Sequence, residues 1–483
     1  MSDRYAEHRS RLAKEIGPEG LAVIPAATEA IRNHDVVHRF RQDSAFWYLT
    51  GFDEPDAVAV IAPGHDDGDF WLFVRPKDPA QEVWTGIRAG EEGARKRFGA
   101  DITYEINELD SVLGRLMFGR EVLWYAAGNE KFDKRITAII AQARSHRERF
   151  GGVVPSTVKD ISVPLSEMML YKYGEEAESL RQACHLSALG HIEAMRFAKP
   201  GMWEYQVQAA LEYFWRLNGS PRNGYPSIVA SGANACILHY GENDSQIGEN
   251  DLILIDAAAE IDGYTSDITR TFPAAGRFSG PQKALYEVVL AAERKGIEMC
   301  APGSTMRGIH DEATRILTEG MVDLGLLPLS VEESLVMHHY SEFYMHGTGH
   351  WLGLDVHDRG SYRVEGQPRP LEPGMSFTVE PGLYVAPDKA EIELTLLAYD
   401  LDERNERRMR LGSAAASAKD AEEKENAETI THQVPQEFLG IGVRIEDDIY
   451  VTADGHENMT SSVPTEITDV EAMCAEEPLL PSR

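Results

Sequence analysis

Four carboxylates in the second half of the sequence lie at positions that suit metal ligands. Asp256 ends the apolar run LILID, and Asp267 follows in TSDITRTF. Glu380 ends SFTVE, directly before a proline, and Glu446 lies in GVRIEDDIYV. A charged side chain that ends an apolar run is costly to bury unless it is paired or bound to a cation. The pattern therefore indicates metal chemistry, although one aspartate near a turn, taken alone, is explained equally well as a capping residue.

The first two carboxylates are predicted to share one β-hairpin. The pair Asp262-Gly263 suits a two-residue type I′ turn, in which both central residues have positive φ. With that turn, Ala258 faces Asp267 across the ladder, and Asp256 lies two residues away on the same face. The carboxylates become diagonal neighbours, roughly 7 to 8 Å apart at the backbone. That span suits two cations about 3.5 to 4 Å apart.

Three histidines, His346, His350 and His357, fall within the short stretch FYMHGTGHWLGLDVHD. Any one of them is explained as readily by a local hydrogen bond at the surface or in the core. As a group they favour one metal ligand and polar groups around a reacting carbonyl, because imidazole both binds metals and carries protons.

Arg444 lies two residues before Glu446 and therefore on the same face of a predicted strand. An arginine beside a carboxylate can fix the orientation of a metal ligand. An ordinary ion pair explains the spacing equally well.

Four carboxylates with one imidazole and no thiolate favour Mn²⁺, Co²⁺, Fe²⁺ or Zn²⁺ over Ca²⁺. Two such ions can share one water, which becomes hydroxide near neutral pH, while the metals polarise a carbonyl. The sequence thus predicts peptide hydrolysis through a metal-bridging hydroxide.

The elements that would position these residues indicate an α/β fold with two domains. The first part contains short strand-like runs such as GLAVIP, AVAVIAP and DFWLFVRP. The Gly- and Pro-containing stretch FGGVVPSTVKDISVP separates it from a long helix that begins near Gly174. We therefore expect an N-terminal domain over residues 1–165 and a catalytic domain over residues 166–468, whose strand runs carry the candidate ligands.

Two segments depart from this pattern. Residues 389–436 include a charged, Ala-rich stretch, which predicts an insertion that is a solvated helix or a disordered loop. Residues 469–483 predict a peripheral acidic tail.

Composition narrows the class of protein. The net charge of -32 over 483 residues argues against a nucleic-acid partner. Four cysteines without a CxxC pair indicate reduced thiols. The charged, amphipathic N-terminus and the lack of an apolar run of about eighteen residues predict a cytoplasmic enzyme without a membrane partner.

These segments together resemble aminopeptidase P, the Xaa-Pro aminopeptidase of the pita-bread metallopeptidase family. The motifs occur in the family's order: NACILHYGEN, LILIDAAAEIDGYTSDITRTFP, HGTGHWLGLDVHD, LEPGMSFTVEPGLYVAPD and GIGVRIEDDIYVT. RNHDVVHRFRQDSAFWYLTGFDEPDA and EVWTGIRAGEE look like its N-terminal block. The resemblance implies a creatinase-like N-terminal domain, a pita-bread (creatinase/aminopeptidase-like) catalytic domain, and peptides with proline at the second position as substrates.

Carried over position by position, the resemblance implies a role for each matching residue. The metal ligands, with Mn²⁺ the implied ion, would be Asp256, Asp267, His350, Glu380 and Glu446. Glu380 would also be the general base. His239 and His357 would position substrate and move protons, and His346 would help to shape the proline pocket. Substrate-binding residues would be Trp84, Tyr384 and Arg444; Trp84 matches an aromatic that can lie near a neighbouring subunit's site, which predicts a homo-oligomer (dimer or tetramer).

Other readings stay open. The chain has HGTGHWLG where the family often has HGLSHWLG, a change that keeps the histidine spacing. A prolidase of the same fold, which cleaves only Xaa-Pro dipeptides, would need the same ligands. A non-catalytic pita-bread protein would be expected to lose ligands, and a metal-free creatinase-like amidinohydrolase would lack the carboxylate set.

Overall fold

The structure, a computed structural model, describes residues 4–396, residues 427–479 and a few isolated positions between 406 and 419. The chain divides into two compact units, Met1–Met169 and Leu170–Arg483, which are described separately. The boundary expected after residue 165 falls inside helix α7 (Ser162–Leu170).

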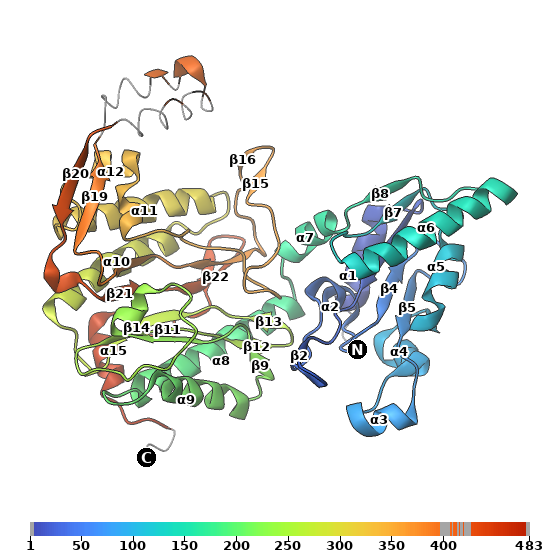
Figure 1. The fold of residues 1–483 in the computed structure, drawn as a ribbon, viewed down its shortest axis with the longest axis horizontal. Coiled ribbons are helices and arrows are strands. Elements are labelled where there is room, and N and C mark those ends of the chain that lie inside the picture. The colour runs from blue at the N-terminus through green and yellow to red at the C-terminus, as the bar shows by residue number, and fades with distance from the viewer. Residues whose placement is uncertain are drawn as a thin grey trace. The chain divides into compact units, whose positions relative to one another are not determined.

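Unit 1 is built on a mixed six-stranded sheet with the strand order β6-β5-β4-β1-β7-β8 (Figure 1). Strands β1, β4 and β5 pair antiparallel, whereas β6, β7 and β8 join in parallel. The strands predicted from GLAVIP, AVAVIAP and DFWLFVRP are confirmed as β1, β4 and β5. The strands of the sheet are β1 (Gly20–Pro25), β4 (Val58–Ile61), β5 (Phe70–Val74), β6 (Ile102–Glu105), β7 (Val122–Trp124) and β8 (Thr157–Lys159).

Helices flank this sheet. The predicted amphipathic N-terminal helix is confirmed as α1 (Arg4–Ile16), which buries Tyr5, Leu12 and Ile16. A separate two-stranded ribbon is formed by β2 (Ile31–Asn33) and β3 (Val36–Val37). The remaining helices are α2 (Ser44–Thr50), α3 (Pro79–Thr85), α4 (Gly90–Phe98), η1 (Ile106–Glu108), α5 (Leu109–Leu116) and α6 (Glu130–Phe150).

Unit 2 contains several small antiparallel sheets rather than one large one. They have the strand orders β10-β11-β14, β13-β12-β9 and β17-β22-β23, with the pairs β18-β21, β19-β20 and β15-β16. Their bounds are β9 (Arg222–Asn223), β10 (Ile228–Ser231), β11 (Leu252–Asp256), β12 (Ala259–Ile261), β13 (Tyr264–Thr265), β14 (Thr269–Pro273), β15 (Arg363–Val364), β16 (Gln367–Pro368), β17 (Ser376–Val379), β18 (Gly382–Val385), β19 (Glu391–Thr395), β20 (Thr429–Gln433), β21 (Ile441–Arg444), β22 (Asp447–Val451) and β23 (His456–Asn458).

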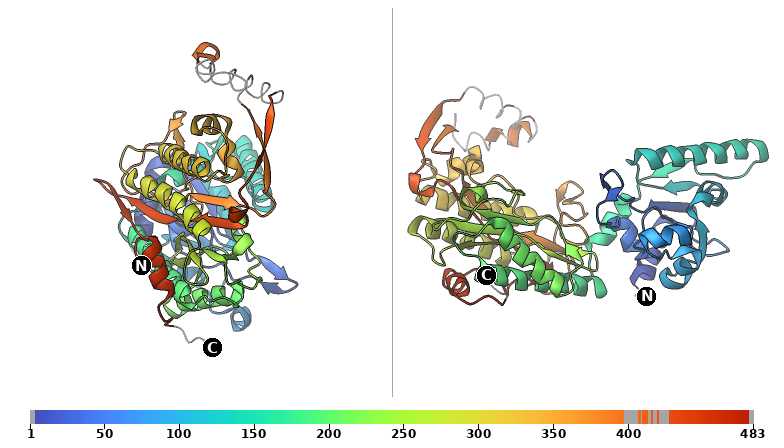
Figure 2. Two further views of the ribbon diagram at one scale, coloured as in Figure 1. Left: turned by 90° about the vertical axis from the view of Figure 1, so that its left-hand side faces the viewer. Right: turned by 60° about the horizontal axis from the view of Figure 1, so that its bottom comes forward.

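Two pairs of helices cover these strands on opposite sides (Figures 1 and 2). The first pair is α8 (Glu175–Phe197), the helix predicted near Gly174, and α9 (Glu204–Leu217). The second pair is α10 (Gly280–Glu298) and α11 (Met306–Asp323). The other described helices of the unit are η2 (Gly232–Cys236), α12 (Val331–Met337), η3 (His339–Glu342), η4 (Gln436–Phe438) and α15 (Ile467–Cys474).

Strand β11 shows how this layering directs a side chain to the interior. Ile253 and Ile255 pack into the apolar core beneath α8 and α9. Leu252 and Leu254 alternate with them and join other clusters. Asp256 continues the second set, because side chains two residues apart share one face of a strand. The carboxylate therefore points away from the α8–α9 layer.

Some residues of the expected insertion and of the expected tail form regular structure that the sequence did not predict. The ends of residues 389–436 pair as the ribbon β19–β20, and Ile392 and Leu394 are buried because EIELT alternates apolar and polar residues. Residues 397–405 and most of 408–426 lie outside the described residues. The first residues of the expected tail are not peripheral, since Val470 and Cys474, four apart on α15, enter the core.

Two further predictions concern the whole chain. The described cysteines are all free thiols, and three are buried while Cys236 is half-buried. Within the part of the chain that the structure describes, no helix is both long enough and apolar enough to cross a bilayer.

Candidate metal centre

The predicted hairpin is confirmed. Ile261 and Tyr264 form the last pair of the ladder, which leaves Asp262 and Gly263 as the central residues with φ of 52° and 85°. The same register continues into the pairing of β11 with β14. The two aspartates predicted to be diagonal neighbours therefore lie on the same face of the hairpin.

Tyr225 joins these two aspartates. Its hydroxyl donates to Asp256 Oδ1 at 2.6 Å and also bonds Asp267 Oδ1. Burial, followed by the charges of the two aspartates, raises the pKa of Tyr225 well above its ordinary value. The phenol therefore stays protonated and holds two buried carboxylates close together.

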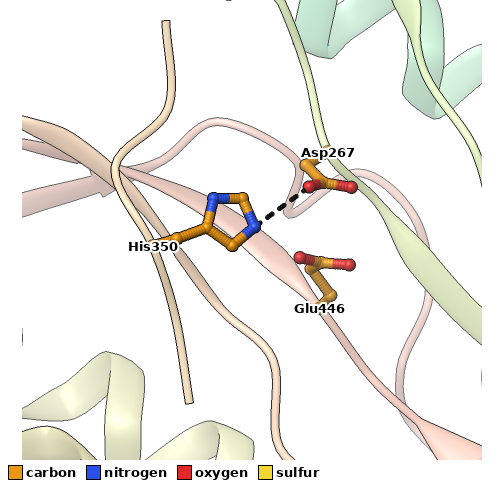
Figure 3. A group of neighbouring side chains, drawn as sticks. All are labelled: Asp267, His350 and Glu446. Carbon is orange, nitrogen blue, oxygen red and sulfur yellow. Dashed lines mark ion pairs between the residues drawn. The ribbon is translucent and has the colours of Figure 1, made fainter. Parts of the chain in front are cut away.

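His350 approaches the hairpin from a segment that runs beside β17. The backbone N–H of His350 donates to Thr378 Oγ1 at 3.1 Å, and the N–H of Thr378 donates to the His350 carbonyl at 3.0 Å. The ring Nε2 then lies 3.3 Å from Asp267 Oδ2, as Figure 3 shows, and 3.5 Å from Glu380 Oε1. One imidazole thus contacts carboxylates from two different parts of the chain.

Glu380 is held where β17 ends. Its backbone N–H donates to the Thr348 carbonyl at 2.9 Å, and Thr378 Oγ1 donates to Glu380 Oε1 at 3.3 Å. Pro381 follows and has no N–H to continue the ladder. The strand therefore stops with its carboxylate at the cavity.

Glu446 and Arg444 do not pair in the way the sequence suggested. Arg444 instead forms its ion pair with Asp256, and its Nε donates to Thr269 Oγ1 at 2.9 Å. The same hydroxyl donates to Glu446 Oε2 at 2.6 Å. The sequence left open whether this arginine orients a ligand or forms an ordinary ion pair with Glu446, and the carboxylate that it contacts is instead that of Asp256, 188 residues away in the sequence. Thr269 links the two residues.

All five predicted ligands line one cavity of about 310 Å³. Atoms of Asp267, His350 and Glu446 that could bind a metal lie within 4.8 Å of one another (Figure 3). Asp256, Asp267 and Glu446 are buried, whereas His350 and Glu380 are half-buried. The geometry therefore gathers four carboxylates and one imidazole in a single enclosed space.

The charges in this cavity disturb one another strongly. Burial, followed by the charges of Asp267 and Glu380, raises the pKa of Glu446 well above its ordinary value. Burial also raises the pKa of Glu380 to about 7, with His350 and Arg444 acting in the opposite direction. Burial lowers the pKa of His350, but the hydrogen bond to Asp267 and the charges of Glu380 and Asp267 outweigh it and raise the pKa to about 9. Without a cation the cavity therefore holds more negative charge than it can stabilise.

The other predicted histidines and Tyr384 lie around these residues. His239, His346 and His357 line the same cavity, and the rings of His350 and His357 meet edge to face with centroids 4.4 Å apart. His346 Nε2 is hydrogen-bonded to the Tyr384 hydroxyl at 2.9 Å. Burial, together with the charge of Arg444, lowers the pKa of His346 to about 4. This imidazole is therefore neutral near neutral pH.

Two predicted site residues are not among those that line this cavity. Tyr384 is buried and contacts the lining through the hydrogen bonds of its hydroxyl with His346 and Arg444. The other is Trp84. It belongs to unit 1, on α3, where its side chain is 83% exposed. It is not among the residues that line the cavity.

Sequence reasoning missed Tyr225 and Asp448. Asp448 is buried and accepts hydrogen bonds from the Asp267 N–H, at 3.0 Å, and from the Ser266 hydroxyl, at 2.7 Å. Its signal was present in GVRIEDDIYV, because Asp448 is two residues from Glu446 on the same face. Tyr225 lies in NGYPS and gives no comparable signal.

Comparison with known proteins agrees with this site. Residues 178–453 match the model of metallopeptidase family M24, and residues 5–124 match the aminopeptidase P N-terminal domain. The chain is 37% identical to the Xaa-Pro aminopeptidase of Haemophilus influenzae, with 97% of this chain and 96% of that protein covered. It is 35% identical to the Xaa-Pro aminopeptidase of Escherichia coli, with 97% of each covered.

Solved structures give the same result. The aminopeptidase PepP of Pseudomonas aeruginosa superposes with a TM-score of 0.87 at 44% identity, covering 98% of this chain and 97% of that one. Zinc-substituted Escherichia coli aminopeptidase P in complex with product superposes with a TM-score of 0.86 at 35% identity, covering 98% of each chain. The predicted architecture, a mixed α/β N-terminal domain followed by a pita-bread domain, is confirmed. The chain belongs to metallopeptidase family M24, with the N-terminal domain of the aminopeptidases P.

Proposed function

We propose that this chain is an aminopeptidase that uses two divalent metal ions to hydrolyse the Xaa-Pro bond at peptide N-termini. The observation that carries the proposal is the meeting of Asp256, Asp267, His350, Glu380 and Glu446 in one cavity. The substrate class is inferred from the two Xaa-Pro aminopeptidases that the chain matches along nearly its whole length.

The five residues fit two divalent cations because of their donor atoms and their charge. Four carboxylates line the cavity with one guanidinium, that of Arg444, and of the four histidines that also line it only His350 is among the five. Buried charges of one sign are costly unless a counter-charge is present. Burial, together with the charges of neighbouring carboxylates, raises the pKa values of Glu380 and Glu446, and a cation would act against both causes. Asp267, between Tyr225 and His350, is central enough to serve both ions.

The reaction needs a nucleophile, a polarised carbonyl and a route for one proton. When bound, the metals would lower the pKa of water and polarise the scissile carbonyl. Glu380 is placed to accept the proton of the attacking water, since it lines the cavity and is held by Thr348 and Thr378. It would then deliver that proton to the departing proline nitrogen.

The surrounding residues would orient the peptide. His239 and His357 line the cavity and are exposed within it, so each can donate to the peptide or exchange a proton with solvent. The neutral ring of His346 lines the cavity and would offer a surface for the proline ring. Tyr384 is buried and would hold that ring in place through the hydrogen bond between them. Arg444 would keep Asp256 ionised.

Three finer points belong to the same proposal. Mn²⁺ is the ion we favour, because oxygen ligands predominate. We also propose a homo-oligomer, because the aromatic ring of Trp84 is exposed on unit 1. A cytoplasmic location is the third.

The proposal is tested by metal analysis and by a small peptide set. After Mn²⁺ loading and dialysis, we expect two ions per chain, measured by atomic emission. Turnover is then measured on Arg-Pro-Pro, on Gly-Pro and on Arg-Ala-Pro as a control without proline at the second position. Cleavage of Gly-Pro alone would assign a prolidase instead. A chain that retains no metal would contradict the proposal altogether.

A further inference from the structure

A second cavity lies against the metal centre. It has a volume of about 220 Å³, and Gly347 and Gly349 line both it and the metal cavity. Thr348 between them is buried, and its hydroxyl is hydrogen-bonded to His310 Nδ1 at 2.9 Å and to the Tyr344 hydroxyl at 2.5 Å. The two cavities therefore share one wall, which is fixed by hydrogen bonds.

The second cavity is cationic. Arg307, Arg363 and Arg369 line it, and no Asp or Glu is among the described residues that do so. This is unusual in a chain with 79 acidic and 47 basic residues. Asp311 pairs with Arg307 at 2.8 Å but lies outside the lining, and both side chains are more than half exposed. An anionic group inside the cavity would therefore meet arginines only.

Different elements supply these arginines. Arg307 belongs to the first turn of α11, where the helix dipole adds positive potential. Arg363 lies on β15, and Arg369 follows β16 with its side chain 7% exposed. The β15–β16 hairpin is closed by a bond from the Arg369 N–H to the Tyr362 carbonyl at 3.0 Å. The cationic lining is thus built into a folded hairpin and a helix start.

The rest of the lining suits the stem of a side chain. The rings of Trp351 and Tyr362 stack with centroids 5.4 Å apart, and Met306 and Pro368 complete an apolar surface. His310 contributes little charge, because burial and the charge of Arg307 lower its pKa. The cavity combines an apolar floor with arginine donors, which is the chemistry that recognises a carboxylate on a short aliphatic stem.

We propose that this cavity binds a carboxylate of the peptide downstream of the scissile bond, either the C-terminal carboxylate of a short peptide or an acidic side chain of a longer one. The inference rests on the proposed function. An aminopeptidase places only one residue before the bond it cuts, so nearly all of a longer peptide must lie on the other side. The neighbouring cavity, which shares Gly347 and Gly349 with the metal cavity, offers arginine donors for that part.

The first arm of the test compares peptides that differ only in downstream charge. Metal-loaded protein is assayed on Ala-Pro-Asp-Ala amide, Ala-Pro-Lys-Ala amide and their fourth-position counterparts, and on Ala-Pro-Ala as acid and amide. We expect kcat/KM to be about tenfold higher for each acidic member, equivalent to one good charged contact. The preference should weaken at high salt. A preference for Ala-Pro-Ala acid over its amide would show that the cavity binds the C-terminal carboxylate. A preference for the Asp over the Lys peptides would show that it binds an acidic side chain.

The second arm assigns the preference to the cavity. Arg363→Gln and Arg307→Gln should bring the ratio of kcat/KM for the acidic peptide to kcat/KM for the basic peptide toward one. The rate on neutral Ala-Pro-Ala-Ala amide should stay unchanged. Arg315→Gln is the matched control, because Arg315 lies on the same helix and is also paired with acidic neighbours, yet does not line the cavity. Its ratio should equal that of the unaltered chain.

The outcomes separate this inference from the proposed function. No cleavage of Ala-Pro-Ala-Ala amide would reject the aminopeptidase proposal. In that case calorimetric titration of the metal-loaded protein with Pro-Asp amide and Pro-Lys amide decides the inference, which requires tighter binding of the first that is lost in Arg363→Gln. Cleavage without any charge preference, or equal ratios in Arg363→Gln and Arg315→Gln, would overturn it.

Discussion

The metal centre and the arginine-lined cavity share the wall at Gly347 and Gly349 but have opposite charge. The metal cavity gathers four carboxylates, whereas the described lining of its neighbour contains three arginines and no carboxylate. In each cavity, charged side chains of one sign predominate among the described lining residues. The first needs cations and the second an anion, so the pair is suited to a substrate that binds metals at one end and carries a carboxylate at the other.

The comparison also separates two ways of building a site. In the metal centre, the ligands are tied to one another by short contacts such as Tyr225 to Asp256 and Thr269 to Glu446. In the arginine cavity, Arg307 is more than half exposed and Arg363 donates to the Gly366 carbonyl at 3.0 Å. We therefore expect substitutions in the first to cost much more than substitutions in the second.

Removing the central carboxylate should have the largest effect. Asp267→Asn keeps the shape, and its amide oxygen can still accept from Tyr225, but it loses the negative charge that contacts His350 and would hold the metals. We expect kcat/KM on Ala-Pro-Ala-Ala amide to fall by roughly 10³-fold or more, equivalent to about 4 kcal/mol of transition-state stabilisation. Metal content, measured on the same sample, should fall below two ions per chain.

The control for this variant is Asp454→Asn, in the exposed turn after β22. It changes the net charge equally and should leave activity and metal content unaltered. Full activity of Asp267→Asn would exclude this carboxylate from the centre.

Metal removal should destabilise the fold in a pH-dependent way. In the metal-free protein the pKa of Glu380 is raised to about 7, so the folded state keeps a proton that the unfolded state releases at lower pH. That stabilising contribution is complete below the unfolded pKa and is lost as pH rises through about 7. The affinity for metal instead rises with pH, because the ligands must lose their protons before they bind. These ligands include His350, whose pKa is about 9.

The difference in melting temperature between loaded and metal-free protein should therefore grow from pH 5 to pH 8. With free metal at a hundredfold excess over Kd, binding contributes about 2.7 kcal/mol, which corresponds to roughly 4 °C in a unit of the size of Leu170–Arg483. Differential scanning calorimetry measures both states. A difference that stays constant over this range would show that these groups do not titrate with metal binding.

Loss of the Tyr225 hydroxyl should weaken metal binding without removing a ligand. Tyr225→Phe deletes the donor that joins Asp256 and Asp267. Groups that orient metal ligands typically contribute 10- to 100-fold in affinity, and we expect a loss of about tenfold by calorimetric titration with Mn²⁺. Tyr213→Phe, at an exposed position on α9, is the matched control. Equal affinities in the two variants would mean that the aspartates are positioned without the phenol.

The sequence could predict features that depend on neighbouring residues, but not those that depend on residues far apart in the chain. The turn at Asp262-Gly263 fixes the register of both aspartates within a dozen residues, so their proximity follows from the residues alone. The bonds from Tyr225 to these aspartates span 31 and 42 residues, and that from Arg444 to Asp256 spans 188, so only the complete fold brings the partners together. The roles of the histidines depended on resemblance, because spacing within a loop does not determine where a ring points.

A charge reversal in the arginine lining is the sharpest test of the contrast between the two cavities. Arg363→Glu places a carboxylate in the lining that has none, so the predicted preference should reverse, with Ala-Pro-Lys-Ala amide cleaved faster than Ala-Pro-Asp-Ala amide by a factor of a few. Arg315→Glu introduces the same charge change elsewhere on unit 2 and should leave the preference acidic. Metal content should stay at two ions in both variants, since neither arginine lines the metal cavity. If Arg363→Glu lost metal as well, the two cavities would be coupled through their shared wall, and the separation of their roles would fail.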